Sequence, residues 1–460
     1  MIAILYLKKS KMAKKCFNFA LMKRLLIILI MCIPFIMDAQ TTMSVLNHSH
    51  QVNKGETLLT IAQQYNITEQ ALLTANTEIS KNGKLKKGTY LIIPQPVIAQ
   101  KTEEAVPEVV TPQKPSTIKV GVILPFEEKT ERGKKMVEFY QGFLMAADSI
   151  KKEGLNLDIY TFNSGSTEAE IMEILMKPEM STLHMLFGPV DEQQLPATIS
   201  FCKIHNIRLV LPFTNGQSTI ENPHLYLACP NNTVTITEAA ALVSRAYSDK
   251  NFIILKSNNE NTKGTLFTKT LSDMLGKQGN IVRTVNIDGD EFAYEMAMNQ
   301  FKDNFIVPDN TSIKTLNILI SNLDAFCQKH PAYNVSLLGY PEWQTYTNTL
   351  LNSFFTFNTY AYSTYYYNAL AMNTKSFEQA FTKNFGKIMA VNYPRYGMMG
   401  FDLAYYIIHD FMAEGSGEEI VQMPYQSMFR FIQDAENSGY SNRFIQLIHY
   451  TKTKQIELIR

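Results

Sequence analysis

The residue types that most often carry enzymatic chemistry are present in this sequence, but they lack the spacing that catalysis requires. A nucleophile elbow has the pattern Gly-x-Ser-x-Gly between a strand and a helix, whereas only the fragment Gly415-Ser416-Gly417 occurs here, in a polar stretch. The zinc-protease pattern His-Glu-x-x-His and the phosphate-binding pattern Gly-x-x-x-x-Gly-Lys are both absent. We therefore expect a protein with no catalytic residues and no cofactor.

The five cysteines and eight histidines are too scattered to predict a metal site. No Cys-x-x-Cys pair occurs and the histidines show no ligand spacing, so we expect no bound metal ion. Cys202 and Cys327 lie in apolar stretches of helical period, which predicts buried thiols. The sequence does not decide whether Cys202 and Cys229 form a disulfide bridge, because spacing alone is not enough.

The first 40 residues differ in charge from the rest of the chain. They contain seven basic residues and one acid, and the remainder has 36 basic and 41 acidic residues, a net charge of −5. This mildly acidic remainder argues against nucleic-acid binding, which needs clustered cations to neutralise phosphates. Lys23 and Arg24 precede an apolar run, Leu25 to Met37, that is shorter than the roughly 20 residues needed to cross a bilayer. We interpret residues 1–39 as a secretory signal peptide.

The start and the cleavage point of this signal peptide stay open. Met22 would give a more compact start, and Met37 fits poorly at the third position before the cleavage site, where a small residue is usual. Cys32 follows Met31 rather than a small residue, so we interpret it as part of the apolar run and not as a lipidation site. The sequence therefore predicts secretion through the inner membrane into the periplasm, with no membrane span.

Residues 50–94 contain short apolar segments separated by turn-forming residues. A strand around Val52 ends at Gly55, and Thr57 can cap a helix with one apolar face, which holds Leu58, Ile61, Ala62 and Tyr65. A second short helix begins near Thr68 and carries Leu72 and Leu73. Gly88 then turns the chain into a closing strand that ends at Pro94. The order predicts a small βααβ module.

This module resembles the LysM family. The matching patterns are His-x-Val-x-x-Gly-Glu-Thr-Leu-x-x-Ile-Ala from His50 and Leu-x-x-Gly-x-x-Leu-x-Ile-Pro from Leu85, and we place the domain at residues 45–95. The resemblance implies binding to N-acetylglucosamine (GlcNAc)-containing glycan, chiefly peptidoglycan, in a shallow groove between two loops. The implied contacts are Gly55, Glu56, Thr57 and Leu58 on one side and Thr77, Glu78 and Ile79 on the other. One departure is Thr77, which stands where the family often has proline.

Strands and helices alternate after a linker at residues 96–117, which is rich in proline and glutamate and has no periodic apolar face. The apolar pattern predicts strands at 118–126, 155–162, 183–189, 208–212, 251–256, 281–287, 315–320 and 335–339. We interpret the aromatic run 354–367 as strand core followed by a helix face, with carbohydrate stacking as the alternative. Such alternation predicts an α/β fold with doubly wound sheets. Because residues 118–460 exceed what one core supports, we expect two lobes.

Residues 118–455 resemble the type I periplasmic-binding-protein family, in the branch of branched-chain amino-acid binders and receptor ligand-binding domains. The resembling segments are 119–125, 140–149, 187–190, 207–212, 338–343 and 396–404. The resemblance implies two hinged lobes that close on a ligand without chemistry. Ligands in such folds bind beyond the carboxyl ends of the strands, which implies a cleft lined by Phe126, Asp191, Thr214, Lys256, Ser257, Asn322, Tyr340, Tyr362 and Ser363.

This implied cleft departs from the pattern of amino-acid binders. Asp191 and Glu192 follow the Gly188-Pro189 segment, where the family places hydroxyl donors, and acids there repel a carboxylate. The sequence leaves the ligand of this cleft open. It could be an amino acid, a neutral or cationic small molecule, or a muropeptide or sugar fragment, and the cleft could also bind no ligand. Asp191 as a helix N-cap and Lys256 as a solvated strand end are the structural alternatives.

The two resemblances together predict a non-catalytic cell-wall protein. Its LysM module binds peptidoglycan, and its two-lobed domain binds a small ligand in the cleft. In the alternative, the two-lobed domain has lost its ligand and serves as an anchored scaffold for an unknown protein partner. The sequence does not identify that partner or a permease.

Overall fold

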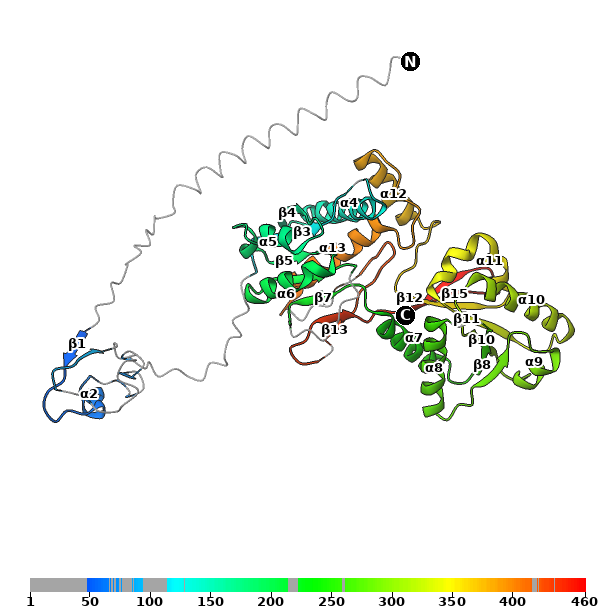
Figure 1. Ribbon diagram of the computed structural model, residues 1–460, viewed down its shortest axis with the longest axis horizontal. Coiled ribbons are helices and arrows are strands. Elements are labelled where there is room, and N and C mark those ends of the chain that lie inside the picture. Colours follow the sequence, from blue (N-terminus) through cyan, green and yellow to red (C-terminus); the bar gives the residue numbers. More distant parts are fainter. Residues whose placement is uncertain are drawn as a thin grey trace, which may run out of the picture. The chain divides into compact units, whose positions relative to one another are not determined.

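The chain divides into two units in this computed structural model, residues 1–109 and residues 110–460 (Figure 1). The structure describes residues 48–65, 67, 69, 72–73, 76, 85, 87–93, 114–127, 129–213, 222–258, 261–415, 420, 422–433 and 435–460. The predicted signal peptide and most of the predicted linker lie outside these residues. Within the described part, no helix is both long enough and apolar enough to cross a membrane.

The first unit is built on a two-stranded antiparallel sheet. β1 (His48–Gln51) pairs with β2 (Tyr90–Ile93). α2 (Leu58–Gln64) begins after Thr57, whose hydroxyl accepts a hydrogen bond from the Thr60 N–H, as the sequence predicts. Residues 72 and 73 are also helical. The core consists of Val52, Ile61, Ala62, Leu72, Leu91 and Ile93.

The second unit begins with a lobe built on a seven-stranded sheet, here called lobe 1. The strand order is β13 (Phe431–Gln433), β14 (Tyr440–Asn442), β7 (Leu225–Leu227), β6 (Arg208–Leu211), β5 (Met185–Phe187), β3 (Thr117–Leu124) and β4 (Asn156–Asn163). All neighbours are parallel except β13, which pairs antiparallel with β14 at the edge.

Helices cover both faces of the lobe 1 sheet, which explains why the inner strand β3 buries apolar residues on both faces. On β3, Val120 and Val122 pack against α4 (Glu131–Lys152) and α13 (Tyr396–Ala413). Ile123 points to the other face, in a cluster with residues of α5 (Glu168–Leu175) and α6 (Leu195–Ile204). α12 (Met372–Phe385) adds a small cluster around Phe377 and Phe381.

A second seven-stranded sheet forms lobe 2. Its order is β16 (Ile456–Ile459), β15 (Gln446–Tyr450), β12 (Thr359–Ser363), β11 (Val335–Gly339), β10 (Asn304–Pro308), β8 (Asn251–Lys256) and β9 (Arg283–Asn286). The helices of this lobe are α7 (Asn232–Ala246), α8 (Thr262–Lys277), α9 (Glu291–Ala297), α10 (Ile313–Lys329) and α11 (Thr347–Thr356). One continuous apolar cluster joins these helices to the sheet.

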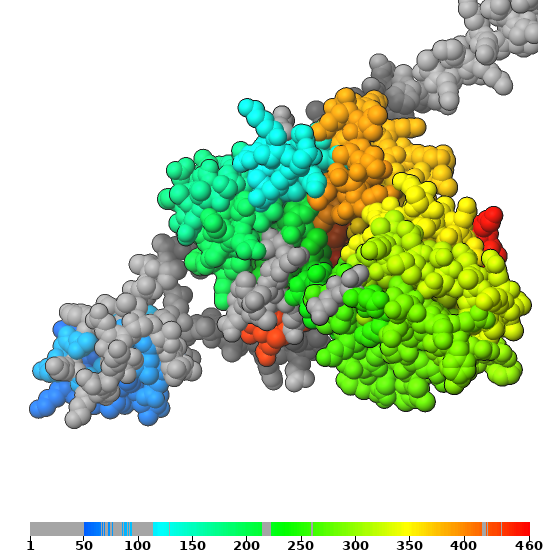
Figure 2. Space-filling model, turned by 45° about the vertical axis from the view of Figure 1, so that its right-hand side comes forward, coloured from blue at the N-terminus to red at the C-terminus, as the bar shows by residue number. Residues whose placement is uncertain are grey.

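Three segments connect the two lobes, which lie side by side in Figures 1 and 2. Residues 228–231 lead from β7 to α7, residues 364–371 from β12 to α12, and residues 443–445 from β14 to β15. The first two leave the carboxyl ends of parallel strands. The third enters β15 at Gln446, which lies opposite Ser363 at the end of β12. The carboxyl edges of both sheets therefore lie at the hinge, where the sequence places the cleft.

The predicted strand at residues 315–320 is wrong, because these residues belong to α10. The Ser312 hydroxyl caps this helix by accepting from the Thr315 N–H, and Leu316, Leu319 and Leu323 are buried at helical spacing. The strand of this βα unit is β10, eleven residues earlier. A short apolar run does not separate strand from helix unless its period is counted over a longer window.

The order predicted for the aromatic run 354–367 is also wrong. Residues 354–356 end helix α11, and the strand β12 follows them. The two elements meet at Asn358, which has φ +43°, a left-handed conformation that asparagine tolerates better than most residues. Phe354 and Tyr362 are fully buried, so these rings serve the core and not a sugar-stacking surface.

Candidate functional site

The first loop of the LysM unit holds the sequence-predicted glycan contacts in a defined shape. Gly55 has φ +96° and lies in a turn after β1, a conformation that glycine adopts without strain. Thr57 forms a capping box with Thr60, in which each side chain accepts from the backbone N–H of the other. Gly55 and Thr57 are exposed, and Leu58 packs against the small core.

Glu56 fixes this loop through hydrogen bonds within the protein. Its carboxylate accepts from the Asn53 N–H at 2.7 Å and from the Asn53 side-chain amide at 3.2 Å. It also lies 2.9 Å from the His50 Nε2 atom, and the His50 Nδ1 atom lies 3.0 Å from the Tyr65 hydroxyl. The Asn53 N–H and the His50 ring lower the pKa of Glu56 to about 2. This carboxylate therefore stabilises the loop itself.

The second side of the predicted groove is not described. Thr77, Glu78 and Ile79 lie outside the described residues, so their predicted role as glycan contacts stays a prediction. Asn76, just before them, donates its side-chain amide to the Leu72 carbonyl at 2.8 Å. That bond ties the start of the loop to the second helix.

On lobe 1, the sequence-predicted cleft residues lie at the carboxyl edge of the sheet. Phe126 follows β3, is half-buried, and has its ring centroid 5.3 Å from that of Tyr140. Asp191 follows β5 and forms a 2.9 Å ion pair with Arg132 on the first turn of α4. Its side chain makes no N-cap hydrogen bond, so the capping alternative is wrong. Thr214 lies outside the described residues.

On lobe 2, Lys256 and Ser257 meet a residue that sequence reasoning missed. The Asp309 carboxylate follows β10, accepts from the Ser257 N–H at 2.8 Å, and lies 3.5 Å from the Lys256 Nζ atom. Lys256 ends β8 with its side chain 43% exposed, so it is both a solvated strand end and an ion-paired residue. Asp309 went unpredicted because the strand before it, β10, was assigned to the wrong segment. An apolar segment ending in Pro308-Asp309 was the available signal.

Three predicted cleft residues are instead part of the core of lobe 2. Tyr340, Tyr362 and Ser363 are fully buried. The Tyr340 hydroxyl donates to the Pro308 carbonyl, and the Ser363 hydroxyl accepts from the Gln344 amide at 3.0 Å. These residues do follow or end parallel strands, as predicted, but their side chains point beneath the adjacent helices and not into an open surface.

Asn322 is also displaced from the predicted position. It lies on α10 and donates its side-chain amide to the Ile287 carbonyl at 2.7 Å. It therefore ties a helix to the segment after β9 and does not stand at a strand end. The error follows from the wrong strand at residues 315–320.

The structure brings together other charged residues at the carboxyl edges. Lys263, near the start of α8, forms an ion pair with Glu342, which follows β11. On lobe 1, the Lys135 Nζ atom lies 5.6 Å from the ring centroid of Tyr396, a cation–π distance. Sequence patterns placed none of these four residues at the cleft, because each pairs with a partner far away in the chain.

The thiols and the histidines add no reactive centre to these edges. Cys202, Cys229 and Cys327 are free, so the bridge between Cys202 and Cys229 is not formed. Burial raises the pKa of the Cys229 thiol to about 11, which keeps it protonated at neutral pH. Among the described residues, no three His, Cys, Asp or Glu side chains gather closely enough to hold a metal ion.

Comparison with known proteins agrees with both units. The family model described as LysM domain matches residues 50–94. A putative branched-chain amino-acid ABC transporter structure from Rhodospirillum rubrum aligns with TM-score 0.52 and 12% identity, covering 75% of this chain and all of that one. Full-length LpoA from Haemophilus influenzae aligns with TM-score 0.48 and 13% identity, covering 75% of this chain and 60% of that one. Among curated protein sequences, no match was found.

Together these observations define a chain with a small LysM domain and a two-lobed α/β unit. Residues 50–94 form a LysM domain, and the second unit has the type I periplasmic-binding-protein fold. The sequence-based recognition of both families and the predicted α/β fold class are therefore confirmed.

Proposed function

We propose that this chain is a secreted, non-catalytic envelope protein that binds the GlcNAc-containing glycan of peptidoglycan through its LysM domain. The observation that supports this most is the preformed loop, in which Gly55 is left-handed and Glu56 is held by Asn53 and His50. Because the loop is ordered in advance, little conformational entropy is lost when its exposed backbone groups bond acetamide and hydroxyl groups. The N-terminal apolar run supports secretion and a location at the periplasmic cell wall.

A pelleting assay with purified sacculi tests the anchoring function. Gly55→Ala and Gly88→Ala make a matched pair, because both glycines have φ near +95° and both have open space where a Cβ would lie. Each substitution should destabilise the domain by about 1 kcal/mol, since alanine at positive φ is strained. Only Gly55→Ala should reduce the fraction of full-length chain that pellets. If wild type and Gly55→Ala pellet with sacculi to the same extent, the predicted groove is contradicted.

For the two-lobed domain we propose binding of a neutral or cationic ligand, such as a sugar fragment, between the carboxyl edges. The supporting observation is Asp191, whose second carboxylate oxygen is buried and has no hydrogen-bond partner among the described residues. An acceptor of this kind fits a ligand N–H or O–H group and repels a carboxylate. Free amino acids are therefore the less favoured class.

Calorimetry and thermal shift of the full chain against amino acids, muropeptides and oligosaccharides test this second function. A ligand that binds only the folded state raises the unfolding midpoint by mass action. Asp191→Asn should remove the shift, whereas Asp158→Asn, an exposed carboxylate on β4, should retain it. A shift that survives Asp191→Asn would place the ligand elsewhere, for example on the LysM domain.

A scaffold function without a small ligand is the second candidate. The burial of Tyr340, Tyr362 and Ser363 favours it, because these side chains fill the core where a lined ligand surface was expected. In that case no compound in the panel stabilises lobe 1 or lobe 2, and binding is seen only with a protein partner. The same thermal-shift panel therefore separates the two candidates.

A further inference from the structure

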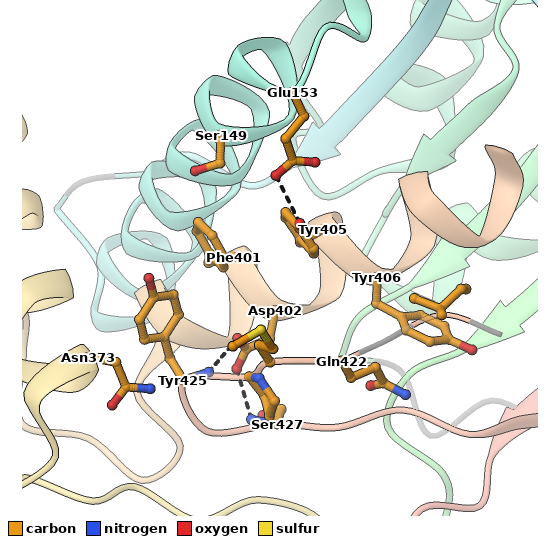
Figure 3. Close-up of a pocket in the computed structure, with 13 residues that line it drawn as sticks. Ser149, Glu153, Asn373, Phe401, Asp402, Tyr405, Tyr406, Gln422, Tyr425 and Ser427 are labelled. Atoms are coloured by element: carbon orange, nitrogen blue, oxygen red, sulfur yellow. Dashed lines mark hydrogen bonds between the residues drawn. The ribbon is translucent and has the colours of Figure 1, made fainter. Parts of the chain in front are cut away.

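Two adjoining cavities form a depression along α13 on lobe 1. The first has a volume of about 340 Å³ and lies between the end of α4, one face of α13 and the segment 422–427 (Figure 3). The second has a volume of about 550 Å³. The two share Tyr406, Ile420 and Gln422. We call the two cavities together the lobe 1 trough.

The second cavity of the lobe 1 trough lies away from the carboxyl edges at the hinge. This cavity is lined by Arg208, the first residue of β6, and by Tyr440, the first residue of β14. These residues mark the amino edge of the sheet. The first cavity reaches from Glu153, just after α4, to Asn373 near the start of α12. None of the described residues of the predicted cleft lines either cavity, so a molecule in the trough leaves those residues free.

The wall opposite α13 is held in one conformation by hydrogen bonds. The Asp402 carboxylate accepts from the N–H groups of Tyr425 at 2.9 Å and Ser427 at 2.8 Å (Figure 3). It also accepts from the Gln426 N–H at 2.9 Å. The Gln422 side chain accepts from the Phe429 N–H at 2.8 Å and donates to the Phe429 carbonyl at 2.7 Å. A ligand therefore meets a wall that is already ordered, which lowers the entropy lost on binding.

Eight of the 23 residues that line the trough are aromatic. The rings of Phe401 and Tyr405 are stacked with centroids 5.7 Å apart, and those of Tyr226 and Tyr440 are stacked at 4.8 Å. Tyr406 lies between these pairs and lines both cavities. At the rim, the Met423 side chain is 84% exposed. Flat rings beside an exposed methionine form a surface that suits apolar side chains.

The charge of the trough is acidic. Arg208 contacts two carboxylates, Asp410 at 2.6 Å and Glu414 at 3.0 Å, so one cation faces two anions. Glu153 accepts from the Tyr405 hydroxyl at 2.9 Å and lies 2.9 Å from His409. Burial lowers the pKa of His409, which favours the neutral imidazole, so His409 adds little positive charge beside Glu153. The other cation at the rim, Arg430, is ion-paired with Glu238.

From the volume, the aromatic lining and the acidic rim, we propose that the lobe 1 trough binds a basic, apolar peptide segment of a partner protein. Apolar side chains of the segment lie against Tyr405 and Tyr406, and its lysine or arginine side chains reach Glu153 and Glu414. Complementary charge favours such a partner over an acidic one and makes binding salt-dependent.

Fluorescence anisotropy with the full-length chain tests this proposal. The probe is a labelled octapeptide, Gly-Lys-Leu-Lys-Phe-Lys-Leu-Gly, compared with one peptide in which Glu replaces Lys and another in which Ser replaces Leu and Phe. Only the first should bind, and its affinity should fall when the salt concentration rises. Glu153→Gln combined with Glu414→Gln should weaken binding at least fivefold. Glu173→Gln, an exposed carboxylate on α5 of the same lobe, should leave binding unchanged.

Photo-crosslinking locates the bound peptide. With benzoylphenylalanine in place of Phe, crosslinks should map to residues 401–406 or 422–431. Crosslinks elsewhere, or equal loss of affinity in Glu173→Gln, would overturn the proposal. So would binding of chitotetraose in the trough without binding of the peptide, or a dimer of this chain that the double variant disrupts. Pelleting with sacculi should be the same for the double variant and wild type, which keeps this test independent of the LysM function.

Discussion

At the residue scale, the Glu56 carboxylate stabilises the loop that the LysM resemblance assigns to glycan binding. Its partners, Asn53 and His50, come from the same turn and from β1. Family resemblance identifies Glu56 as a contact, but the geometry also gives it a positioning role. The stability that Glu56 gives to the loop therefore depends on pH, because only the ionised carboxylate accepts these hydrogen bonds.

Glu56→Gln should loosen the loop and reduce pelleting with sacculi. The pKa of Glu56 is lowered from 4.5 to about 2 in the folded state. Its contribution to stability is therefore fully present above about pH 4.5 and is lost as the pH falls toward 2. Hydrogen exchange of residues 48–65 should increase in wild type over that range and show less pH dependence in Glu56→Gln. Glu69→Gln, an exposed residue of the same unit, should behave like wild type.

Tyr340 and Tyr362 offer a second test at this scale, of what a buried hydroxyl contributes to stability. Both rings are fully buried, but the Tyr340 hydroxyl is hydrogen-bonded and the Tyr362 hydroxyl has no partner among the described residues. Tyr340→Phe removes a buried hydrogen bond to Pro308 and should lower the free energy of unfolding by about 1 kcal/mol. The Tyr362 hydroxyl is buried without a partner among the described residues, so Tyr362→Phe should be neutral or stabilising by about 1 kcal/mol. Denaturant titration measures both values. Equal losses would mean that Tyr362 has a partner.

At the element scale, α4 and α13 depend on glycines for their close approach. A Cβ on Gly142 would lie 1.7 Å from the Gly397 carbonyl oxygen, and a Cβ on Gly400 would lie 2.0 Å from the Phe139 carbonyl oxygen. Both contacts are with backbone atoms, which cannot rotate away. The helix pair builds the upper wall of the lobe 1 trough, so this packing also positions Glu153 relative to Tyr405.

Gly400→Ala should therefore lower the free energy of unfolding by about 3 kcal/mol or more, because the two helices must separate. Gly276→Ala is the matched control on helix α8, where nothing lies within 4 Å of the added Cβ. That substitution should raise the free energy of unfolding by about 0.5–1 kcal/mol, since alanine is the better helix former. Thermal and denaturant unfolding measure both. A mild effect of Gly400→Ala would show that α13 can shift at low cost.

At the scale of the whole two-lobed unit, ion pairs hold the lobes together next to the hinge. Glu238 on α7 of lobe 2 contacts Arg430 of lobe 1 at 3.1 Å and Arg443 of the third connecting segment at 3.3 Å. Asn442 adds a hydrogen bond to the Ala228 carbonyl of the first connecting segment at 3.3 Å. These contacts restrict the angle between the lobes.

Glu238→Gln should broaden the distribution of distances between the lobes. Fluorescence energy transfer between dyes on α5 and α10 measures that distribution, and high salt should have the same effect on wild type because it screens exposed ion pairs. Glu342→Gln breaks an ion pair with Lys263 that lies within lobe 2, and it should leave the distribution unchanged. An unchanged distribution in Glu238→Gln would assign hinge rigidity to the backbone alone.

Much of the fold was predictable because local patterns decide it. The LysM pattern, the apolar strands and their alternation with helices are all properties of short windows, and short windows set which face an element buries. The wrong element assignments occur at residues 315–320 and 354–367, where the apolar run is too short to show its period by itself. There the start of α10 depends on the Ser312 cap, and the start of β12 depends on the left-handed Asn358.

The sequence by itself determined the two modules, their order and the ends of several strands, but not those of β10 or β12. The tertiary structure decided which side chains at those ends are available to a ligand. Asp191 forms an ion pair with Arg132, and Lys256 forms one with Asp309, and both partners are distant in the chain. Tyr340 and Tyr362 are fully buried. The physical reason is that burial and ion pairing depend on contacts between distant segments, which no local pattern of residues encodes.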